Sequence, residues 1–333
     1  MSTISDIARL AGVSTGTVSK VLNNDSTVKD KNRERVLNAM KELDYQPNLY
    51  ARNLSRGKTG LVSIIIPTIG QEFQARLVNS IDSLLSKYGY DSILFPMLSR
   101  ERLSRFSDPF HYLYHTDGMI IASLSLQGLF GSKGLPVTKP LMMVDTHDEI
   151  HDCVYIDNRL GGLMAAEKLQ ITPASKVFIV GGYESDEQFS SRVFEDRVEG
   201  FLEGIELRGI PRESVEQIPI ILEWELAYKK GFELSALYSD LSVFCLSDIL
   251  ARGFIEGASA NKKLAGIDYS LIGFDNLEFS EALGISTIAQ PVEKMGEFAA
   301  RRIIEAIEAP SMVRSAEVLL PEYVERKSNR RES

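Results

Sequence analysis

The 333-residue sequence contains only two cysteines, four histidines and one tryptophan. Cys153 and Cys245 lie far apart, so nothing indicates a disulfide framework. No apolar run approaches the roughly 20 residues needed to cross a bilayer. The amino-terminal segment MSTISDIARLAG also lacks the basic and apolar regions of a secretory signal. We therefore expect a cytoplasmic protein with no membrane partner.

Patterns typical of enzymes are scarce as well. No glycine-rich phosphate loop follows the first predicted strand, and the segment GYESDEQFSSR lacks a nucleophile elbow. His147 and His151 stand four residues apart in DTHDEIHDC, a spacing that suits a metal site on a helix. The same segment contains four further potential ligands: Asp145, Asp148, Asp152 and Cys153. Because it lies between two predicted strands, a solvated acidic loop is favoured, and we expect no catalytic set, metal or cofactor.

The charge is unevenly distributed along the chain. Residues 1–60 contain ten Lys and Arg against six Asp and Glu, a net charge of +4. The remaining residues contain 27 against 40, a net charge of −13, so the whole chain carries −9. A basic amino-terminal part on an acidic body favours a polyanion-binding head and argues against nucleic-acid binding by the whole surface.

The first 46 residues predict three short helices. Four apolar residues of the first helix are spaced i, i+3, i+4, i+7: Ile4, Ile7, Ala8 and Ala11. Thr3 and Asp6 have the spacing of a capping box, Gly12 ends this helix, and Ser14 caps the next. A third helix is expected over residues 31–43, capped by Asp30. Three helices joined in this way indicate a helix-turn-helix unit.

The second helix carries small polar residues where better helix formers would serve a merely solvated surface. Its sequence is VSTGTVSKVLNN, and Gly16 costs about 1 kcal/mol of helix stability relative to Ala. Small residues allow close approach to a nucleic-acid backbone, and hydroxyl groups at a helix start bind phosphate. Lys20 can reach a guanine edge or a phosphate. DNA binding is therefore favoured, with a protein-interaction or packing bundle as the alternative.

Alternating strand and helix patterns fill the remainder of the chain. Buried-strand runs such as LVSIIIP, DGMIIAS, PLMMVD, SKVFIVGG, SVFCLSD and YSLIGFD alternate with amphipathic segments. This alternation predicts parallel sheets covered by helices on both faces. Roughly ten strands suit two sheets better than one. The predicted fold class is an all-α helix-turn-helix head on an α/β body with two parallel-sheet lobes.

The amino-terminal segment, from TISDIARLAGVSTGTVSKVLNN to LVSIIIP, resembles the lactose/galactose repressor (LacI/GalR) family of bacterial transcription regulators. Later segments, IDNRLGG, RVEGF, LIGFDN and IAQPVEKMG, resemble family landmarks in the same order. The resemblance implies two α/β lobes of the periplasmic-binding-protein type. It assigns residues 1–46 to the DNA-binding domain and 47–60 to a hinge helix and linker. One lobe takes 61–158 with 291–318, and the other takes 159–290 with 319–333.

The resemblance also implies which residues contact DNA. Thr15, Gly16 and Lys20 match positions that contact operator bases. Four others match phosphate-positioning residues of the same helix: Ser14, Thr17, Ser19 and Asn23. In the hinge, Leu54 matches a minor-groove wedge, with Asn48 and Arg52 near the backbone. A flexible linker is the alternative for the hinge.

An effector site between the lobes is the second implication. Vicinal hydroxyls of a sugar need paired polar groups, and the ring needs an aromatic face. The matching positions are Phe73, Ser123, Arg197, Trp224, Ser247, Asp275 and Gln290. Arg197 and Asp275 match best, and the alternatives for them are a salt bridge between lobes and the cap of a strand–helix turn. The local spacing around Trp224 differs from the family pattern.

These features together predict a sequence-specific transcription regulator, a repressor, that acts on double-stranded DNA at a palindromic operator. Its partners would be a small sugar-like effector and a second copy of the chain in a homodimer. A sugar-binding receptor without a DNA-dependent role is the alternative, and the basic head argues against it. A nucleotide- or sugar-processing enzyme is the other alternative, but it would need a catalytic carboxylate pair or a phosphate loop.

Overall fold

The computed structural model describes residues 3–22, 25–45, 58–97, 102, 105, 111–131, 134–182, 192–309 and 313–330. The chain divides into two compact units, Met1–Thr59 and Gly60–Ser333. Four residues predicted to contact DNA lie outside the described residues: Asn23, Asn48, Arg52 and Leu54.

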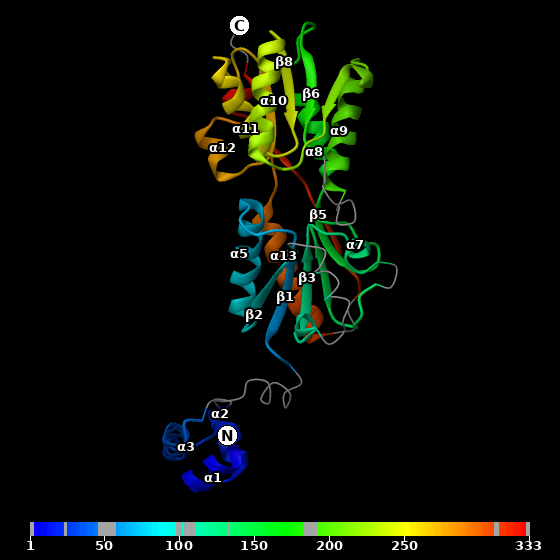
Figure 1. The fold of residues 1–333 in the computed structure, drawn as a ribbon. Helices are drawn as coiled ribbons and strands as arrows, with labels where there is room; N and C mark the ends of the chain where they lie inside the picture. The colour runs from blue at the N-terminus through cyan, green and yellow to red at the C-terminus, as the bar shows by residue number, and fades with distance from the viewer. Residues whose placement is uncertain are drawn as a thin grey trace. The chain divides into compact units, whose positions relative to one another are not determined.

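The first unit contains three helices, α1 (Ile4–Ala11), α2 (Thr15–Leu22) and α3 (Asp30–Glu42) (Figure 1). The predicted capping box of α1 is confirmed, since Asp6 N donates to Thr3 Oγ1 and Thr3 N donates to Asp6. Gly12 ends α1 with a left-handed φ of 62°. Ser14 Oγ accepts from Thr17 N at 3.1 Å, as predicted for the start of α2.

The predicted cap of α3 is wrong. Asp30 is the first residue inside the helix, and Lys29 occupies the cap position without a side-chain hydrogen bond. The third helix is therefore held mainly by packing. A small core joins the three helices through apolar residues that are nearly or fully buried: Ile7, Ala8, Ala11, Val18, Val21, Val36 and Ala39.

The second unit contains two six-stranded sheets, which confirms the prediction of two parallel sheets. The first sheet has the order β11-β5-β4-β3-β1-β2 and all its pairs are parallel. Its strands are β1 (Leu61–Ile66), β2 (Asp91–Pro96), β3 (Gly118–Ala122), β4 (Leu141–Val144), β5 (Asp152–Ile156) and β11 (Ala316–Leu319). A doubly wound order such as 2-1-3-4-5 places ligands at the carboxyl ends of the strands.

The second sheet repeats this order as β12-β10-β9-β8-β6-β7, and only β12 is antiparallel to its neighbour. Its strands are β6 (Lys176–Val180), β7 (Val215–Ile218), β8 (Leu241–Cys245), β9 (Ser270–Asp275), β10 (Ser286–Ala289) and β12 (Glu322–Val324). Strands β11 and β12 follow one another near the carboxyl terminus, yet they belong to different sheets. The chain therefore crosses between the sheets at this point.

Helices cover both sheets (Figure 1). On the first sheet, α5 (Glu72–Lys87) and α13 (Val292–Glu308) pack together against one face, and α7 (Leu126–Phe130) packs on the other. On the second sheet, α8 (Asn158–Lys168) and α9 (Val193–Leu207) cover one face, and α10 (Trp224–Leu237) and α11 (Asp248–Ala260) cover the other. The short helix α12 (Glu278–Ala282) follows β9. Three 3₁₀ turns complete the described elements: Tyr112–Tyr114, Arg212–Ser214 and Lys327–Asn329.

Glycines allow α8 and α9 to approach closely. A Cβ atom on Gly162 would lie 2.1 Å from the backbone oxygen of Arg197, and one on Gly200 would lie 1.9 Å from that of Arg159. Both distances are far below van der Waals contact, so no larger residue fits without a shift of the backbone. This close packing fixes the height of Arg197 on α9 above the ends of the strands.

We predict that Gly162→Ala destabilises the second unit by about 2 kcal/mol. The free-energy cost of overpacking should exceed the stabilisation that Ala brings through its higher helix propensity. Glu167→Ala on the exposed face of the same helix is the matched control and should change stability by less than about 0.5 kcal/mol. Urea unfolding followed by circular dichroism measures both. Equal stability of the two variants would contradict the close packing of α8 and α9.

Candidate functional site

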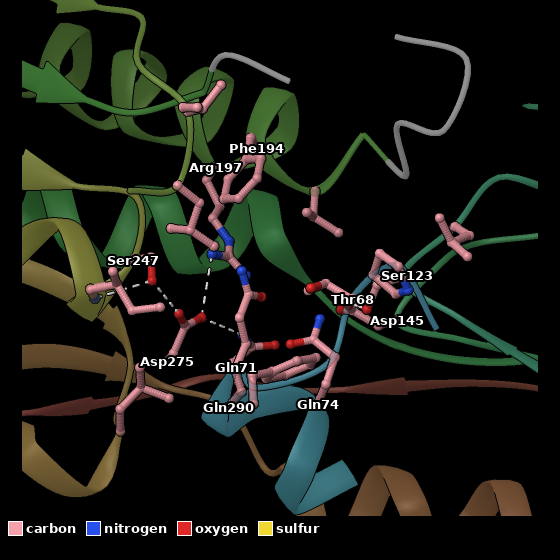
Figure 2. Close-up of a pocket in the computed structure, with 18 of the residues that line it drawn as sticks. Thr68, Gln71, Gln74, Ser123, Asp145, Phe194, Arg197, Ser247, Asp275 and Gln290 are labelled. Carbon is pink, nitrogen blue, oxygen red and sulfur yellow. Dashed lines mark hydrogen bonds and ion pairs between the residues drawn. The ribbon is translucent and has the colours of Figure 1, made fainter. Parts of the chain in front are cut away.

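Six polar residues stand at or just beyond the carboxyl ends of parallel strands. In the first sheet they are Thr68 after β1, Ser123 after β3 and Asp145 after β4; in the second they are Ser247 after β8, Asp275 at the end of β9 and Gln290 after β10. All six line one cavity of about 310 Å³ (Figure 2). The sheets thus contribute facing walls, with Ser123 and Asp145 on one side and Ser247 and Asp275 on the other.

Asp275 accepts three side-chain hydrogen bonds in this cavity. Its Oδ2 accepts from Ser247 Oγ at 2.7 Å, and its Oδ1 accepts from Gln290 Nε2 at 2.7 Å and from Arg197 Nη1 at 3.4 Å. The residue is only 7% exposed. Burial raises the pKa of the Asp275 carboxyl, while Arg197, Ser247 and Gln290 act in the opposite direction.

Arg197 is also buried and heavily engaged. Its Nη1 donates to the Leu246 carbonyl at 2.6 Å, and its Nε donates to Asn158 Oδ1 at 2.8 Å. The guanidinium lies 3.6 Å from the centroid of the Phe274 ring, close enough for a cation–π contact. Arg197 on α9 and its partner Asp275 on β9 both belong to the second sheet and its covering helices, so the alternative of a salt bridge between the two lobes does not hold for Arg197.

The backbone is strained at three residues of the cavity wall. Ser123, Asp145 and Asp275 have φ values of 55°, 55° and 109°, in the region that favours glycine. Side-chain-bearing residues in such conformations cost of order 1–3 kcal/mol each and cluster at functional sites. The strain turns these side chains toward the cavity at the points where the strands end.

Asp145 is buried with few partners. Its Oδ2 accepts from Ser123 Oγ at 2.7 Å, and its Oδ1 has no hydrogen-bond partner in the described structure. Burial raises the pKa of Asp145 to about 6; Ser123 and Arg197 act against this rise, and the charge of Asp275 adds to it. A neutral Asp145 is therefore readily accessible near pH 6.

A second buried carboxyl, Asp248, supports the turn that carries Asp275. Its Oδ2 accepts from Leu277 N at 3.0 Å and from Ser280 Oγ at 2.7 Å, and its Oδ1 accepts from Thr287 Oγ1 at 2.7 Å. Burial and the charge of Asp275 raise the pKa of Asp248 to about 7, against the effect of these donors. Asp248 thus holds the β9–α12 turn in place from behind the cavity wall.

The two lobes also meet directly beside the cavity. Arg76 on α5 donates to the Asn276 carbonyl at 3.1 Å and forms a bidentate pair with Glu293 at 2.9 and 3.0 Å. Glu72, one turn earlier on α5, accepts from Glu278 N at 2.6 Å. The first turns of α5 therefore contact the turn that follows Asp275. Phe73 and Gln74 from the same helix line the cavity.

The structure brings together six of the seven residues predicted for the effector site: Phe73, Ser123, Arg197, Ser247, Asp275 and Gln290. It does not place Trp224 among the residues that line this cavity. Trp224 begins α10, and its indole Nε1 donates to Glu256 at 3.0 Å. It lines a separate depression with Ile249, Arg252 and Phe279. Ile221 and Leu222 contribute apolar side chains to the lining of the cavity.

Sequence reasoning missed five polar or aromatic lining residues: Thr68, Gln71, Gln74, Asp145 and Phe194. Asp145 had a usable signal, since it directly follows the buried run LMMV at a strand end. Instead, the segment from Asp145 to Cys153 was predicted as one solvated acidic loop. That prediction is wrong at both ends, because Asp145 and Cys153 are buried and Asp152 pairs with Arg302 at 2.8 Å.

The middle of that segment remains a surface loop. His151 Nδ1 lies 2.9 Å from Asp148, and His147 packs edge-on against Tyr155. Among the residues that the structure describes, no group of three or more His, Cys, Asp or Glu is placed to hold a metal ion. In the same described part, no helix is long and apolar enough to span a membrane.

In the helical unit, α2 exposes the small polar face that its sequence predicts. Ser14, Thr15, Gly16, Ser19 and Lys20 are exposed, whereas Val18 and Val21 are buried. Among the described residues, a Cβ atom on Gly16 would meet only Ser14 Oγ, at 3.7 Å, so none of their packing contacts requires glycine there. The exposed face of α2 is thus free to contact a ligand closely.

Two family models match the chain. Residues 3–48 match bacterial regulatory proteins of the lacI family, and residues 176–329 match a periplasmic binding protein-like domain. The ribose operon repressor of Halalkalibacterium halodurans is 28% identical over 317 residues, covering 92% of this chain and 91% of the repressor.

Solved structures are similar as well. The crystal structure of a probable transcription regulator from Thermus thermophilus is 32% identical, with a TM-score of 0.68 over 80% of this chain and 97% of that chain. The lac repressor dimer bound to operator and an anti-inducer has the same fold, with a TM-score of 0.79 over 99% of both chains at 20% identity.

We predict that Asp145→Asn stabilises the unliganded protein at neutral pH. Because the folded-state pKa of Asp145 is raised, the folded chain binds the carboxyl proton more tightly than the unfolded chain does. The stability that this proton contributes is lost as pH rises from about 4 to about 6. The difference in unfolding free energy between variant and wild type should grow by about 2 kcal/mol over that range. Urea unfolding at pH 4, 5, 6 and 7 measures it; a difference that does not change with pH would contradict the raised pKa.

Proposed function

The chain belongs to the lacI family of bacterial regulatory proteins, and from this premise we propose that it represses transcription from one palindromic operator under the control of a small sugar-like effector. The observation that carries this proposal is the pairing of a helix-turn-helix head with a polar cavity between two parallel-sheet lobes. A protein that acts on DNA in this way would work in the bacterial cytoplasm.

The DNA contacts are assigned to the exposed face of α2. In a helix-turn-helix unit the second helix enters the major groove with its first residues at base edges. Thr15, Gly16 and Lys20 would contact bases, and Ser14, Thr17 and Ser19 would position the phosphates. Support comes from the exposure of Lys20 and from the open space around Gly16. Asn23, which lies outside the described residues, is assigned a phosphate contact by the family pattern.

We further propose that two copies bind one operator, because a palindrome offers two half-sites related by a twofold axis. The segment 47–60 would join head and body as a hinge helix, with Leu54 as a minor-groove wedge and Asn48 and Arg52 near the backbone. The lobe limits, 61–158 with 291–318 and 159–290 with 319–333, are supported by the assignment of β11 and β12 to different sheets.

The cavity suits a polyhydroxylated ligand. Paired polar groups stand on both walls, and Phe73 and Phe194 offer apolar faces to ring C–H groups. Asp275, Arg197 and Gln290 form a connected donor and acceptor set that can hold neighbouring hydroxyls. A ligand here would contact both lobes at once.

Coupling to DNA requires that the effector bind two arrangements of the lobes with different affinity. The contacts of Glu72 and Arg76 with the β9–α12 turn provide a physical connection, since this turn carries Asp275. A ligand that shifts Asp275 relative to Phe73 would therefore also exert a force on α5 through these contacts. We propose that this shift changes the spacing of the two heads.

Two other functions are weaker proposals. A sugar receptor without a DNA-dependent role would have no use for the exposed small-residue face of α2. An enzyme would need a reactive group in the cavity, but both oxygens of Asp275 and one oxygen of Asp145 are engaged in hydrogen bonds to neighbouring side chains. The relatives that the chain matches are transcriptional regulators.

We predict that Lys20→Ala weakens binding to the operator by ten- to a hundredfold, because a base contact at a guanine edge contributes about 1–3 kcal/mol. The operator is first selected from random duplex DNA, and fluorescence anisotropy then measures binding to it and to a scrambled duplex. Binding to the scrambled duplex should weaken much less.

Lys41→Ala removes the same charge from the exposed surface of α3 and is the matched control. It should reduce binding to both duplexes equally and only slightly. Equal losses for Lys20→Ala on operator and scrambled DNA would show that Lys20 contacts phosphate alone. No sequence preference in the selection would overturn the regulator proposal.

We predict that Asp275→Ala binds the effector ten- to a hundredfold more weakly while it still binds operator, because each charge-assisted hydrogen bond contributes roughly 1.5–3 kcal/mol. Calorimetry with pentoses and hexoses identifies the sugar for wild type, and the same sugar is titrated into the variant. Asp275→Asn keeps the side-chain volume and serves as a second variant in case Asp275→Ala unfolds. The exposed Glu281→Ala on α12 is the control. Sugar binding by Asp275→Ala at wild-type strength would remove Asp275 from the site.

A further inference from the structure

Three side-chain oxygens in the wall of the cavity are buried without a hydrogen-bond partner in the described structure. They are Gln74 Oε1, Asp145 Oδ1 and Gln290 Oε1. All three are acceptors. Buried polar atoms in native proteins are nearly always satisfied, so each unpaired acceptor here indicates a missing donor.

The orientation of two of these acceptors is fixed by their neighbours. Gln290 Nε2 donates to Asp275 at 2.7 Å, so its Oε1 cannot exchange places with the nitrogen without losing that bond. Asp145 already accepts from Ser123 with its other oxygen, at 2.7 Å. Both acceptors therefore require a donor from outside the described side chains.

The charge of the cavity wall adds a second constraint. Among the residues that the structure describes, one cation, Arg197, and two carboxylates, Asp145 and Asp275, line the cavity. Arg197 hydrogen-bonds Asp275, the Leu246 carbonyl and Asn158, and no hydrogen bond joins it to Asp145 in the described structure. With Asp145 ionised, the wall carries one negative charge in excess.

Asp145 is thus a buried carboxyl that is only 4% exposed and whose single hydrogen-bond donor is a serine hydroxyl. Burying an ionised carboxylate without a hydrogen-bonded cationic partner is costly. Its backbone, and that of Ser123, is also held in the left-handed region. Packing alone gives no reason for this combination, whereas a cationic donor bound against Asp145 would supply both the hydrogen bond and the charge.

We propose, building on the effector role proposed above, that the effector is a small polyhydroxylated amine of the amino-sugar class. Its ammonium group binds Asp145, and its hydroxyl groups bind Asp275, Gln290 and Arg197. Figure 2 shows Asp145 on the wall opposite Asp275, so the amine and the hydroxyls belong at opposite ends of the ligand. The same charges disfavour sugar phosphates and sugar acids, since Arg197 is the only lining cation among the described residues and is already paired with Asp275.

The test titrates matched pairs into the full-length chain by calorimetry. Each pair is an amino sugar and its hydroxyl counterpart: glucosamine with glucose, galactosamine with galactose, and mannosamine with mannose. The N-acetyl forms keep the shape but lose the charge, and glucose 6-phosphate adds negative charge. At least one amine should bind ten times more tightly than both its hydroxyl and its N-acetyl counterpart.

Two variants assign the effect to Asp145. Asp145→Asn should weaken the amine at least ten times more than it weakens the neutral sugar, since it removes the charge and keeps the shape. Glu149→Gln makes the same charge change on an exposed residue of the following loop and should leave the preference for the amine intact.

Three results would overturn the proposal. If a neutral sugar binds as tightly as its amine and Asp145→Asn affects both equally, the amine assignment fails while the sugar effector stands. If glucose 6-phosphate binds most tightly, the charge argument is wrong. If the protein binds its operator but binds no carbohydrate, the sugar effector and the amine assignment fail together.

Discussion

The body of this protein is organised around one buried carboxylate. Asp275 accepts hydrogen bonds from Ser247, Gln290 and Arg197, which come from three different parts of the chain. A carboxylate in this position is tolerated only because those donors and the charge of Arg197 offset its desolvation. The turn that presents it is in turn held by Asp248. Removing Asp275 would therefore leave the buried Arg197 guanidinium without its carboxylate partner, so function and stability depend on the same contact.

The parallel-sheet fold explains why this contact forms where it does. Parallel strands end at the same edge of a sheet, and residues that follow them gather there whatever their separation in sequence. Two sheets of the same strand order supply two such edges, and the cavity lies between them. The cost appears at Ser123 and Asp145, where strained backbone and an unsatisfied acceptor lower the stability of the free protein. A ligand that satisfies Asp145 would recover part of that stability.

Local patterns were sufficient to predict the helices of the head and the two sheets. Thr3, Gly12 and Ser14 act on neighbouring residues, so their roles are visible in a few letters of sequence. The roles of residues that depend on contacts distant in sequence were harder to predict. Trp224 was expected in the cavity, yet its hydrogen bond to Glu256 holds it elsewhere. Asp145 was missed because neither its burial nor its positive φ can be predicted from the adjoining acidic residues.

The most direct measurement is a crystal structure of the full chain with the carbohydrate that binds it most tightly. The account predicts one ligand between the lobes, with a donor atom within hydrogen-bond distance of Asp145 Oδ1 and hydroxyl groups on Asp275 and Gln290. The Arg197–Asp275 pair should remain intact. A ligand bound outside this cavity, or one that leaves Asp275 untouched, would contradict the claim that the strand ends around Asp275 form the effector site.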